Sequence, residues 1–249
     1  MYKQIFLIFL LPHVLGDFYL QTDDMSKQKN TKLVGLFKHA AIYAITYILF
    51  SSIIVGWQVL PYCIGLGILH FLIDLLKYLY IKVQKEDILF SKERKLYIID
   101  QILHLSSIAI ISYIFISQGN FILIAPYLHN ILKIVGLPEW QLLSWVLLCG
   151  LIWKPANITI KKLLKSYKPI ENPEANISTQ TGGFIGLLER LVILVLLSIN
   201  QYSAIGLVLT AKSIARYDKI AKDQEFAEYY LLGTLLSTAF VIIVYLVIT

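Results

Sequence analysis

Eight long apolar stretches separated by polar ones are the main pattern of this 249-residue chain. They run approximately over 3–20, 36–56, 58–81, 96–118, 140–153, 184–200, 203–217 and 227–248. About 20 consecutive apolar residues in a helix cross the hydrocarbon core of a bilayer. Backbone polar groups in lipid must be satisfied within the segment, which favours helices. The pattern therefore predicts an all-α, polytopic integral membrane protein with about eight transmembrane helices.

Composition supports the membrane class and excludes nucleic acid as a partner. Hydrophobic residues make up 57% of the chain and charged residues 15%, whereas a soluble domain carries about 25% charged residues. The net charge of +6 comes largely from lysines in the polar stretches, as cytoplasmic loops of membrane proteins show. The two cysteines, Cys63 and Cys149, lie in separate apolar stretches and have no metal-type spacing.

Basic residues alternate along the chain in the way that the positive-inside rule requires. Lysine and arginine are frequent after the first, third, fifth and seventh apolar stretches and nearly absent after the second, fourth and sixth. This alternation agrees with eight spans and predicts that both termini lie on the non-cytoplasmic side. We expect three regions: a four-helix half over 1–120, an outer loop, fifth helix and cytoplasmic linker over 121–183, and a C-terminal helical half over 184–249.

Seven histidines and aspartates interrupt the first four apolar stretches, where such side chains are costly. They are His13, Asp17, His39, His70, Asp74, Asp100 and His104. Six of them form pairs spaced by four residues, which places both members of a pair on one face of a helix. On the predicted topology, all seven lie within about the inner half of a ~30 Å apolar core.

These residue types predict a divalent metal site between the first four helices. Neutral imidazole and carboxylate are the usual ligands of zinc, and also of iron or manganese. The seven groups exceed the needs of one tetrahedral ion, so we expect one or two ions, with zinc as the first choice. Asp17, Asp74 and Asp100 are also candidate catalytic groups, since one aspartate can act as general base on bound water. The alternative is that the pairs are hydrogen bonds within helices, or face a water-filled vestibule.

A second polar set supplies candidate substrate-binding residues at the predicted cytoplasmic ends of the helices. It consists of Gln21, Lys77, Glu189, Arg190, Lys212 and Arg216. Arginine and lysine in this position are suited to hold a phosphate. The competing interpretation is that they snorkel to the interface or form ion pairs that join helix ends.

Several motifs resemble an uncharacterised bacterial membrane family, domain of unknown function 3307. They are Gly16-Asp17-Phe18-Tyr19-Leu20-Gln21, His39, His70-Phe71-Leu72-Ile73-Asp74 and Asp100-Gln101-Ile102-Leu103-His104. The resemblance implies a bacterial inner-membrane location and supplies no substrate. In its layout of histidine and aspartate, the chain is also similar, by distant analogy, to membrane-bound metal-dependent hydrolases.

We therefore expect a membrane-embedded, metal-dependent hydrolase that acts at the cytoplasmic leaflet on a phosphate- or ester-bearing lipid or isoprenoid. Membrane lipid and a small anionic or lipidic substrate are the expected partners. A metal-ion or proton transporter could use the same residues. However, the outer halves of the stretches carry few ionisable groups, and no broken helix pair is evident from the sequence. The third hypothesis is a structural membrane subunit.

Overall fold

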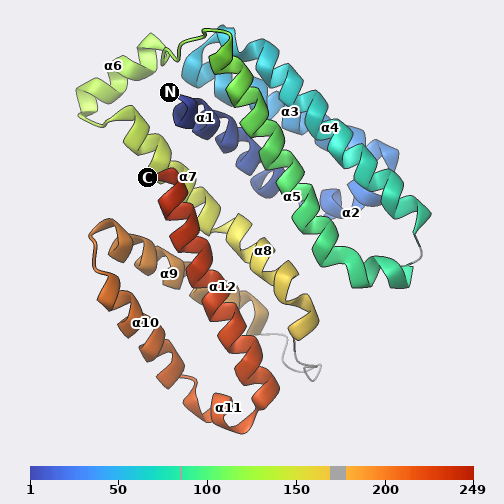
Figure 1. Cartoon of the computed structure of the whole chain (residues 1–249), viewed down its shortest axis with the longest axis vertical. Coiled ribbons are helices and arrows are strands. Elements are labelled where there is room, and N and C mark those ends of the chain that lie inside the picture. Colours follow the sequence, from blue (N-terminus) through green and yellow to red (C-terminus); the bar gives the residue numbers. More distant parts are fainter. Residues whose placement is uncertain (85, 169–177) are drawn as a thin grey trace. The chain divides into compact units, whose positions relative to one another are not determined.

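The computed structural model describes residues 1–84, 86–168 and 178–249, and within these ranges every regular element is a helix (Figure 1). The side chains of 86–91 and 178–181 lie outside this description. The all-α prediction is confirmed. The chain divides into two compact units, Met1–Leu147 and Leu148–Thr249, and the boundary falls inside helix α7, Glu139–Ile152.

The N-terminal unit is built on four helices that form a closed ring. The elements are α1 (Tyr2–Val14), a π-helix (Leu15–Tyr19), α2 (Asp23–Thr31), α3 (Leu33–Val55), a 3-10 turn (Trp57–Val59), α4 (Leu60–Val83), α5 (Glu86–Ser117) and α6 (Pro126–Val135). Helix α1 packs against α3 and α5, and α4 also packs against α3 and α5. Each ring helix therefore has two ring neighbours, and polar side chains pointing inward share one interior.

Five helical stretches among the described residues are long and apolar enough to cross a membrane. They are Leu33–Val55, Trp57–Val83, Lys92–Ser117, Glu139–Tyr167 and Gln224–Ile248. The count is six if the bent pair Tyr2–Tyr19 and Asp23–Thr31 forms one span. Helix α10 (Tyr202–Ile214) is apolar but has only 13 residues. A membrane-spanning class thus agrees with the structure, and the total of eight spans stays a prediction.

The first apolar stretch ends in a sharp bend, which corrects the expectation that the chain lacks a broken helix pair. The segments Tyr2–Tyr19 and Asp23–Thr31 meet at 91°. The physical cause lies in the polar residues that follow the π-helix. The Thr22 side chain accepts a hydrogen bond from the backbone N–H of Met25, and thereby caps a new helix in a new direction.

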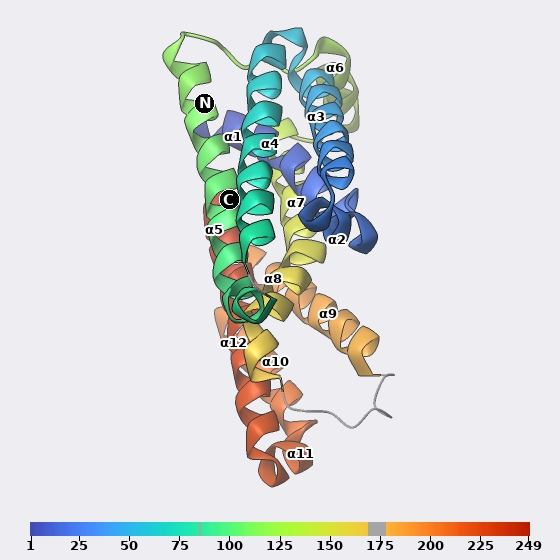
Figure 2. The same cartoon turned by 90° about the vertical axis from the view of Figure 1, so that its right-hand side faces the viewer.

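Helix α2 turns back onto the ring, packing against α3 and α4. Figure 2 shows it at the end of α3 that is opposite to α6. A glycine makes this close approach possible, because a Cβ atom on Gly35 would lie 2.6 Å from the backbone carbonyl carbon of Gln28. Helix α2 can therefore cover one end of the ring interior.

The loop at the other end of the ring, where the sequence predicted an outer loop, contains the short helix α6. Helix α6 begins at Pro126, and its approach is fixed by a hydrogen bond of 2.9 Å from the Ala125 N–H to the Ile54 carbonyl. It ends at Gly136, whose φ of +75° lies in the left-handed region that favours glycine.

The C-terminal unit contains α8 (Lys154–Leu164), a 3-10 turn (Lys165–Tyr167), α9 (Ser178–Ser198), α10, α11 (Tyr217–Lys222) and α12 (Gln224–Ile248). Helix α12 packs against α8, α9 and α11, and α10 packs against α9. The region 121–183, which was expected to end in a cytoplasmic linker, thus contains helix α8 after α7. Its residues 169–177 lie outside the described residues.

Candidate metal site

The ring interior brings together all seven histidines and aspartates that the sequence singled out. His13 comes from α1, Asp17 from the π-helix, His39 from α3, and the other two pairs from α4 and α5. None of the seven is more than 9% exposed. Side chains separated by up to 91 positions in the sequence therefore meet in one buried polar interior.

Four of them form what we call the inner cluster: Asp17, His39, His70 and Asp74. The Nε2 atom of His39 lies 3.1 Å from Asp17 Oδ1, 3.0 Å from His70 Nε2 and 3.4 Å from Asp74 Oδ2. The Nε2 atom of His70 lies 3.5 Å from Asp17 Oδ1 and 3.3 Å from Asp74 Oδ2. One imidazole N–H cannot serve three such neighbours. Ligands around a tetrahedral ion at ~2.1 Å would be separated by about 3.4 Å, close to these values.

A second group, which we call the outer cluster, consists of Asp74, Asp100 and His104, whose ligand atoms lie within 4.8 Å of one another. The His104 Nδ1–H donates to the Asp100 carbonyl at 2.9 Å, which leaves a lone pair on Nε2. This Nε2 atom and Asp100 Oδ1 are buried, and neither has a hydrogen-bond partner in the described part of the chain. Two unmatched buried acceptors in one cluster are what a cation would satisfy.

His13 lies at the edge of both clusters. Its ring centroid is 6.3 Å from that of His70 and 5.5 Å from that of His104. With Asp17 and His70 it forms a third set whose ligand atoms lie within 4.8 Å. The three sets share Asp17, His70 or Asp74 with their neighbours, so the seven residues form one continuous network that is compatible with metal binding.

Lys29 also belongs to this site, although the sequence predicted only a lysine in the polar stretch that follows the first apolar one. Its Nζ atom donates to Asp74 Oδ1 at 3.3 Å and to Asp74 Oδ2 at 3.2 Å, and lies 3.3 Å from His39 Nε2. The residue is 6% exposed because α2 packs over the end of the ring. The capping residue Thr22 and the acidic pair after it were the sequence signals for α2.

Tyr43 is the second member of the site that was not predicted. Its hydroxyl lies 2.9 Å from His13 Nδ1, and its ring stacks on that of His70 with centroids 3.4 Å apart. Tyr43 follows His39 by four residues on the buried face of α3. The same spacing of four residues identified the His and Asp pairs, and it could have predicted that Tyr43 belongs to the site.

The π-helix packs against α3, with Gly16 against the ring of Tyr43. A Cβ atom on Gly16 would lie 2.8 Å from Tyr43 Cδ2, so only glycine allows the tyrosine ring to pack here without a shift. Single π-turns inside α-helices are often found at functional sites. The sequence predicted a regular helix through this point, and the altered turn could not be read from the spacing of His13 and Asp17.

Of the predicted substrate-binding residues, two lie in the N-terminal unit. The Lys77 ammonium forms an ion pair of 3.0 Å with Asp100 Oδ2, next to the outer cluster. The side-chain carbonyl oxygen of Gln21 is buried and has no hydrogen-bond partner in the described part of the chain.

The other four lie in the C-terminal unit, and three of them have partners there. Arg190 donates from Nε to the Ile152 carbonyl at 2.6 Å, and also to Ser237 and Asn157. Lys212 pairs with Glu189 Oε2 at 2.5 Å. Arg216 is exposed at the start of α11. These contacts favour the interpretation as ion pairs joining helices, and the role in substrate binding stays a prediction.

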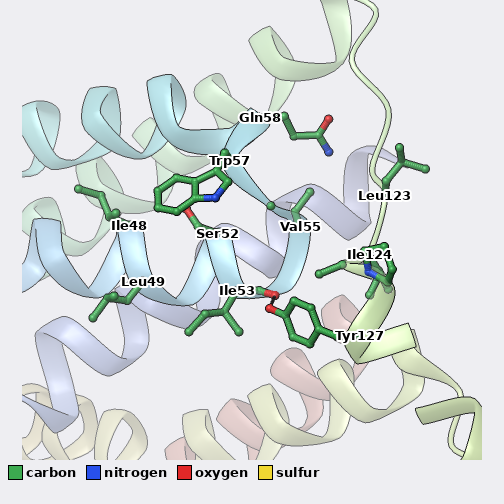
Figure 3. A pocket seen from close by; sticks show the side chains of 13 residues that line it. Ile48, Leu49, Ser52, Ile53, Val55, Trp57, Gln58, Leu123, Ile124 and Tyr127 are labelled. Carbon is green, nitrogen blue, oxygen red and sulfur yellow. Dashed lines mark hydrogen bonds between the residues drawn. The ribbon is translucent and has the colours of Figure 1, made fainter. Parts of the chain in front are cut away.

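An apolar groove of ≈ 740 Å³ lies at the other end of α3 and holds none of the seven residues. Figure 3 shows its lining side chains, which come from the end of α3, the 3-10 turn that follows it, the loop before α6 and the start of α6. They include Ile48, Leu49, Ile53, Trp57, Leu123 and Tyr127. The groove and the polar interior are therefore separate features.

Comparison with known proteins found one family model that matches the part of the chain containing the polar interior. Residues 5–132, a little more than half of the chain, match a family model described as "Protein of unknown function (DUF3307)". No curated protein and no solved structure matches the chain. The matched region contains all seven histidines and aspartates, together with Lys29 and Tyr43.

Proposed function

Because the chain belongs to the DUF3307 family, which is described only by its unknown function, we propose an activity from the polar interior itself. The protein is a membrane-embedded, metal-dependent hydrolase of a phosphate- or ester-bearing lipid or isoprenoid. It resides in a bacterial inner membrane, with eight spans, both termini outside the cytoplasm and the site open toward the cytoplasmic leaflet. The single observation that carries the proposal is the convergence of buried imidazole and carboxylate acceptors from four helices of one ring.

The donor atoms fit one or two divalent ions. Asp17, His39, His70 and Asp74 would hold the first, since their atoms are spaced like the corners of a tetrahedral zinc site. Asp100 and His104 would hold the second, with Asp74 shared between both. The unmatched Asp100 Oδ1 and His104 Nε2 support a cation, because a buried acceptor without a partner costs about 1–3 kcal/mol.

The site also has the groups that hydrolysis needs. When bound, a divalent ion would lower the pKa of a coordinated water to near 7 and would polarise a phosphoryl or carbonyl oxygen. One aspartate, Asp17, Asp74 or Asp100, would accept a proton from the attacking water and return it to the leaving oxygen. Tyr43 fixes the orientation of His13 through their hydrogen bond.

Substrate would enter past helix α2, next to Gln21 and Lys77. The Lys77 ammonium pairs with Asp100 of the network, and the buried side-chain carbonyl oxygen of Gln21 has no hydrogen-bond partner among the described residues. Glu189, Arg190, Lys212 and Arg216 remain candidates for holding an anionic head group.

The test of this function is turnover that depends on metal. Detergent-purified protein is incubated with phospholipid, lipid phosphate and isoprenoid phosphate, and released products are measured by mass spectrometry. We expect chelator treatment to stop turnover, added zinc to restore it, and His70→Ala and Asp100→Ala to abolish it. Full activity of metal-free protein would contradict the proposal.

A metal-ion or proton transporter is the second candidate, and the bend of 91° after the first stretch is the observation that favours it. Discontinuous helices are typical of transporter binding sites. Proteoliposomes separate the two functions. Ion flux that depends on His70 and Asp100, without any turnover of lipid substrates, would favour the transporter.

A further inference from the structure

Lys29 is a cation placed inside a site that is proposed to hold another cation. Its ammonium lies 3.2–3.3 Å from two of the four acceptor atoms of the inner cluster, Asp74 Oδ2 and His39 Nε2. It is 6% exposed, whereas Lys27 and Lys32 at the same end of the chain are exposed. Burying a lysine side chain costs conformational and solvation free energy. The packing of α2 therefore delivers this one lysine to the site.

The net charge of the site decides which further ligand it can bind once a metal ion is present. Asp17, Asp74 and Asp100 carry three negative charges, and Lys29 and Lys77 lie on two of them as ion pairs. One divalent ion changes the sum from negative to positive, and a second makes it more so. Two cations in a poorly solvated interior repel each other strongly, unless an anion lies between them.

We propose that Lys29 and the metal of the inner cluster together bind a phosphate-type oxyanion, and that Lys29 is a substrate-binding residue. This inference rests on the proposed function and narrows it, because it selects a phosphate-bearing substrate over a neutral ester. Lys29 donates to both carboxylate oxygens of Asp74. A bound phosphate offers the ammonium negatively charged oxygens in the same place, and separates it from the metal.

Binding of metal and binding of phosphate are then coupled, and the coupling depends on Lys29. By linkage, an anion that relieves the repulsion strengthens metal binding by the same factor as the metal strengthens anion binding. In a variant that lacks the Lys29 ammonium, no repulsion between lysine and metal opposes metal binding. Its metal affinity without phosphate therefore equals or exceeds that of the wild type, and changes little when phosphate is added.

The test is calorimetric titration of detergent-purified protein with Zn²⁺, with and without millimolar inorganic phosphate. For the wild type, we expect phosphate to strengthen Zn²⁺ binding by at least about tenfold, within the usual range of coupling. For Lys29→Met, we expect Zn²⁺ affinity equal to or above that of the wild type and a phosphate effect below about twofold. Lys27→Met, an exposed lysine of the same helix, is the control and keeps the wild-type coupling.

Additional titrations identify whether the phosphate belongs to a lipid, and further variants show whether a lost effect is due to misfolding. Phosphatidic acid in the micelles replaces inorganic phosphate, and diacylglycerol is its uncharged control. Coupling of Zn²⁺ binding to inorganic phosphate or to phosphatidic acid supports the proposal. Lys29→Arg keeps the cation and should keep most of the coupling, whereas Lys29→Gln should lose it as Lys29→Met does. Equal phosphate coupling in the wild type and in a folded neutral variant would overturn this inference alone. Absence of Zn²⁺ binding to the wild type would instead overturn the proposed function.

Discussion

The N-terminal unit and the C-terminal unit each bury charged side chains among apolar helices, and they use these charges differently. In the C-terminal unit, all three guanidinium nitrogens of Arg190 donate to protein acceptors, and the Lys212 ammonium bonds Glu189 and Thr234. The other oxygen of Glu189, Oε1, is buried and has no partner among the described residues. In the N-terminal unit, three carboxylates and four imidazoles share one buried interior. Asp100 Oδ1 and His104 Nε2 have no partner among the described residues.

The two units therefore show two uses of buried charge. Some charged side chains join helices, and others are placed to bind a ligand. A buried cation that donates to several protein acceptors stabilises the contact between its helices and has fewer donors left for a ligand. A buried set of acceptors with too few donors is stable only when something else neutralises it. The chemistry of the molecule is therefore expected in the N-terminal ring.

The largest effect is expected from Asp74, which belongs to two of the three metal-ligand sets and pairs with Lys29. We expect Asp74→Asn to lower metal affinity by more than about 100-fold, because loss of even an indirect metal contact costs 10–100-fold, so that the purified variant retains little metal. Elemental analysis of the purified protein measures it. Asp24→Asn, an exposed aspartate in α2, should keep the metal, and equal loss in both variants would contradict the assignment.

Arg190 should have a large effect on stability and none on metal. Arg190→Met leaves the Ile152 carbonyl and the Asn157 side chain without their buried donor, so we expect a loss of about 3–5 kcal/mol. Denaturant unfolding in detergent measures the loss, with exposed Arg216→Met as the matched control. If Arg190→Met instead emptied the metal site of a folded protein, the division between the two units would be wrong.

Gly35 tests whether α2 must pack closely on α3. A Cβ at this position would lie 2.6 Å from the Gln28 carbonyl carbon, so Gly35→Ala should cost about 1–3 kcal/mol through overpacking. The same change should move Lys29 from Asp74 and weaken the phosphate coupling. Gly206→Ala is the control, since its Cβ meets nothing within 4 Å. A Gly35→Ala protein with wild-type stability and coupling would argue against the packing described for α2.

The smallest effect is expected for Tyr43→Phe, which removes only the hydroxyl that bonds His13 Nδ1. The ring stack on His70 remains, so the metal should stay bound with about tenfold lower affinity. Titration with Zn²⁺ measures this, and Tyr113→Phe, whose tyrosine is 66% exposed, is the control. An unchanged affinity would show that His13 does not need this partner.

The ring helices and the seven acceptors could be predicted from the sequence because their signals are local. Apolar stretches define α3, α4 and α5, and a spacing of four residues aligns His70 with Asp74 and Asp100 with His104 on one face. The same reasoning, continued along α3, leads from His39 to Tyr43.

Lys29 could not be predicted in this way, because its role depends on tertiary packing. Three features together direct α2 over the ring: the π-turn at Leu15–Tyr19, the bend after it, and the close approach of α2 to α3 at Gly35. None of them is marked by a periodic pattern of apolar and polar residues in the sequence. Similarly, the hydrogen-bond partners of Arg190 come from α7, α8 and α12. The hydropathy pattern does not predict which of these helices pack together.

The most direct measurement is the metal content of the purified wild-type protein, determined by elemental mass spectrometry beside a His39→Ala, His70→Ala double variant. The account predicts at least one zinc, iron or manganese ion per wild-type chain, retained through gel filtration, and less than about a tenth of that in the folded double variant. A well-folded wild-type protein that holds no such metal, and does not take it up when it is added, would contradict the central claim.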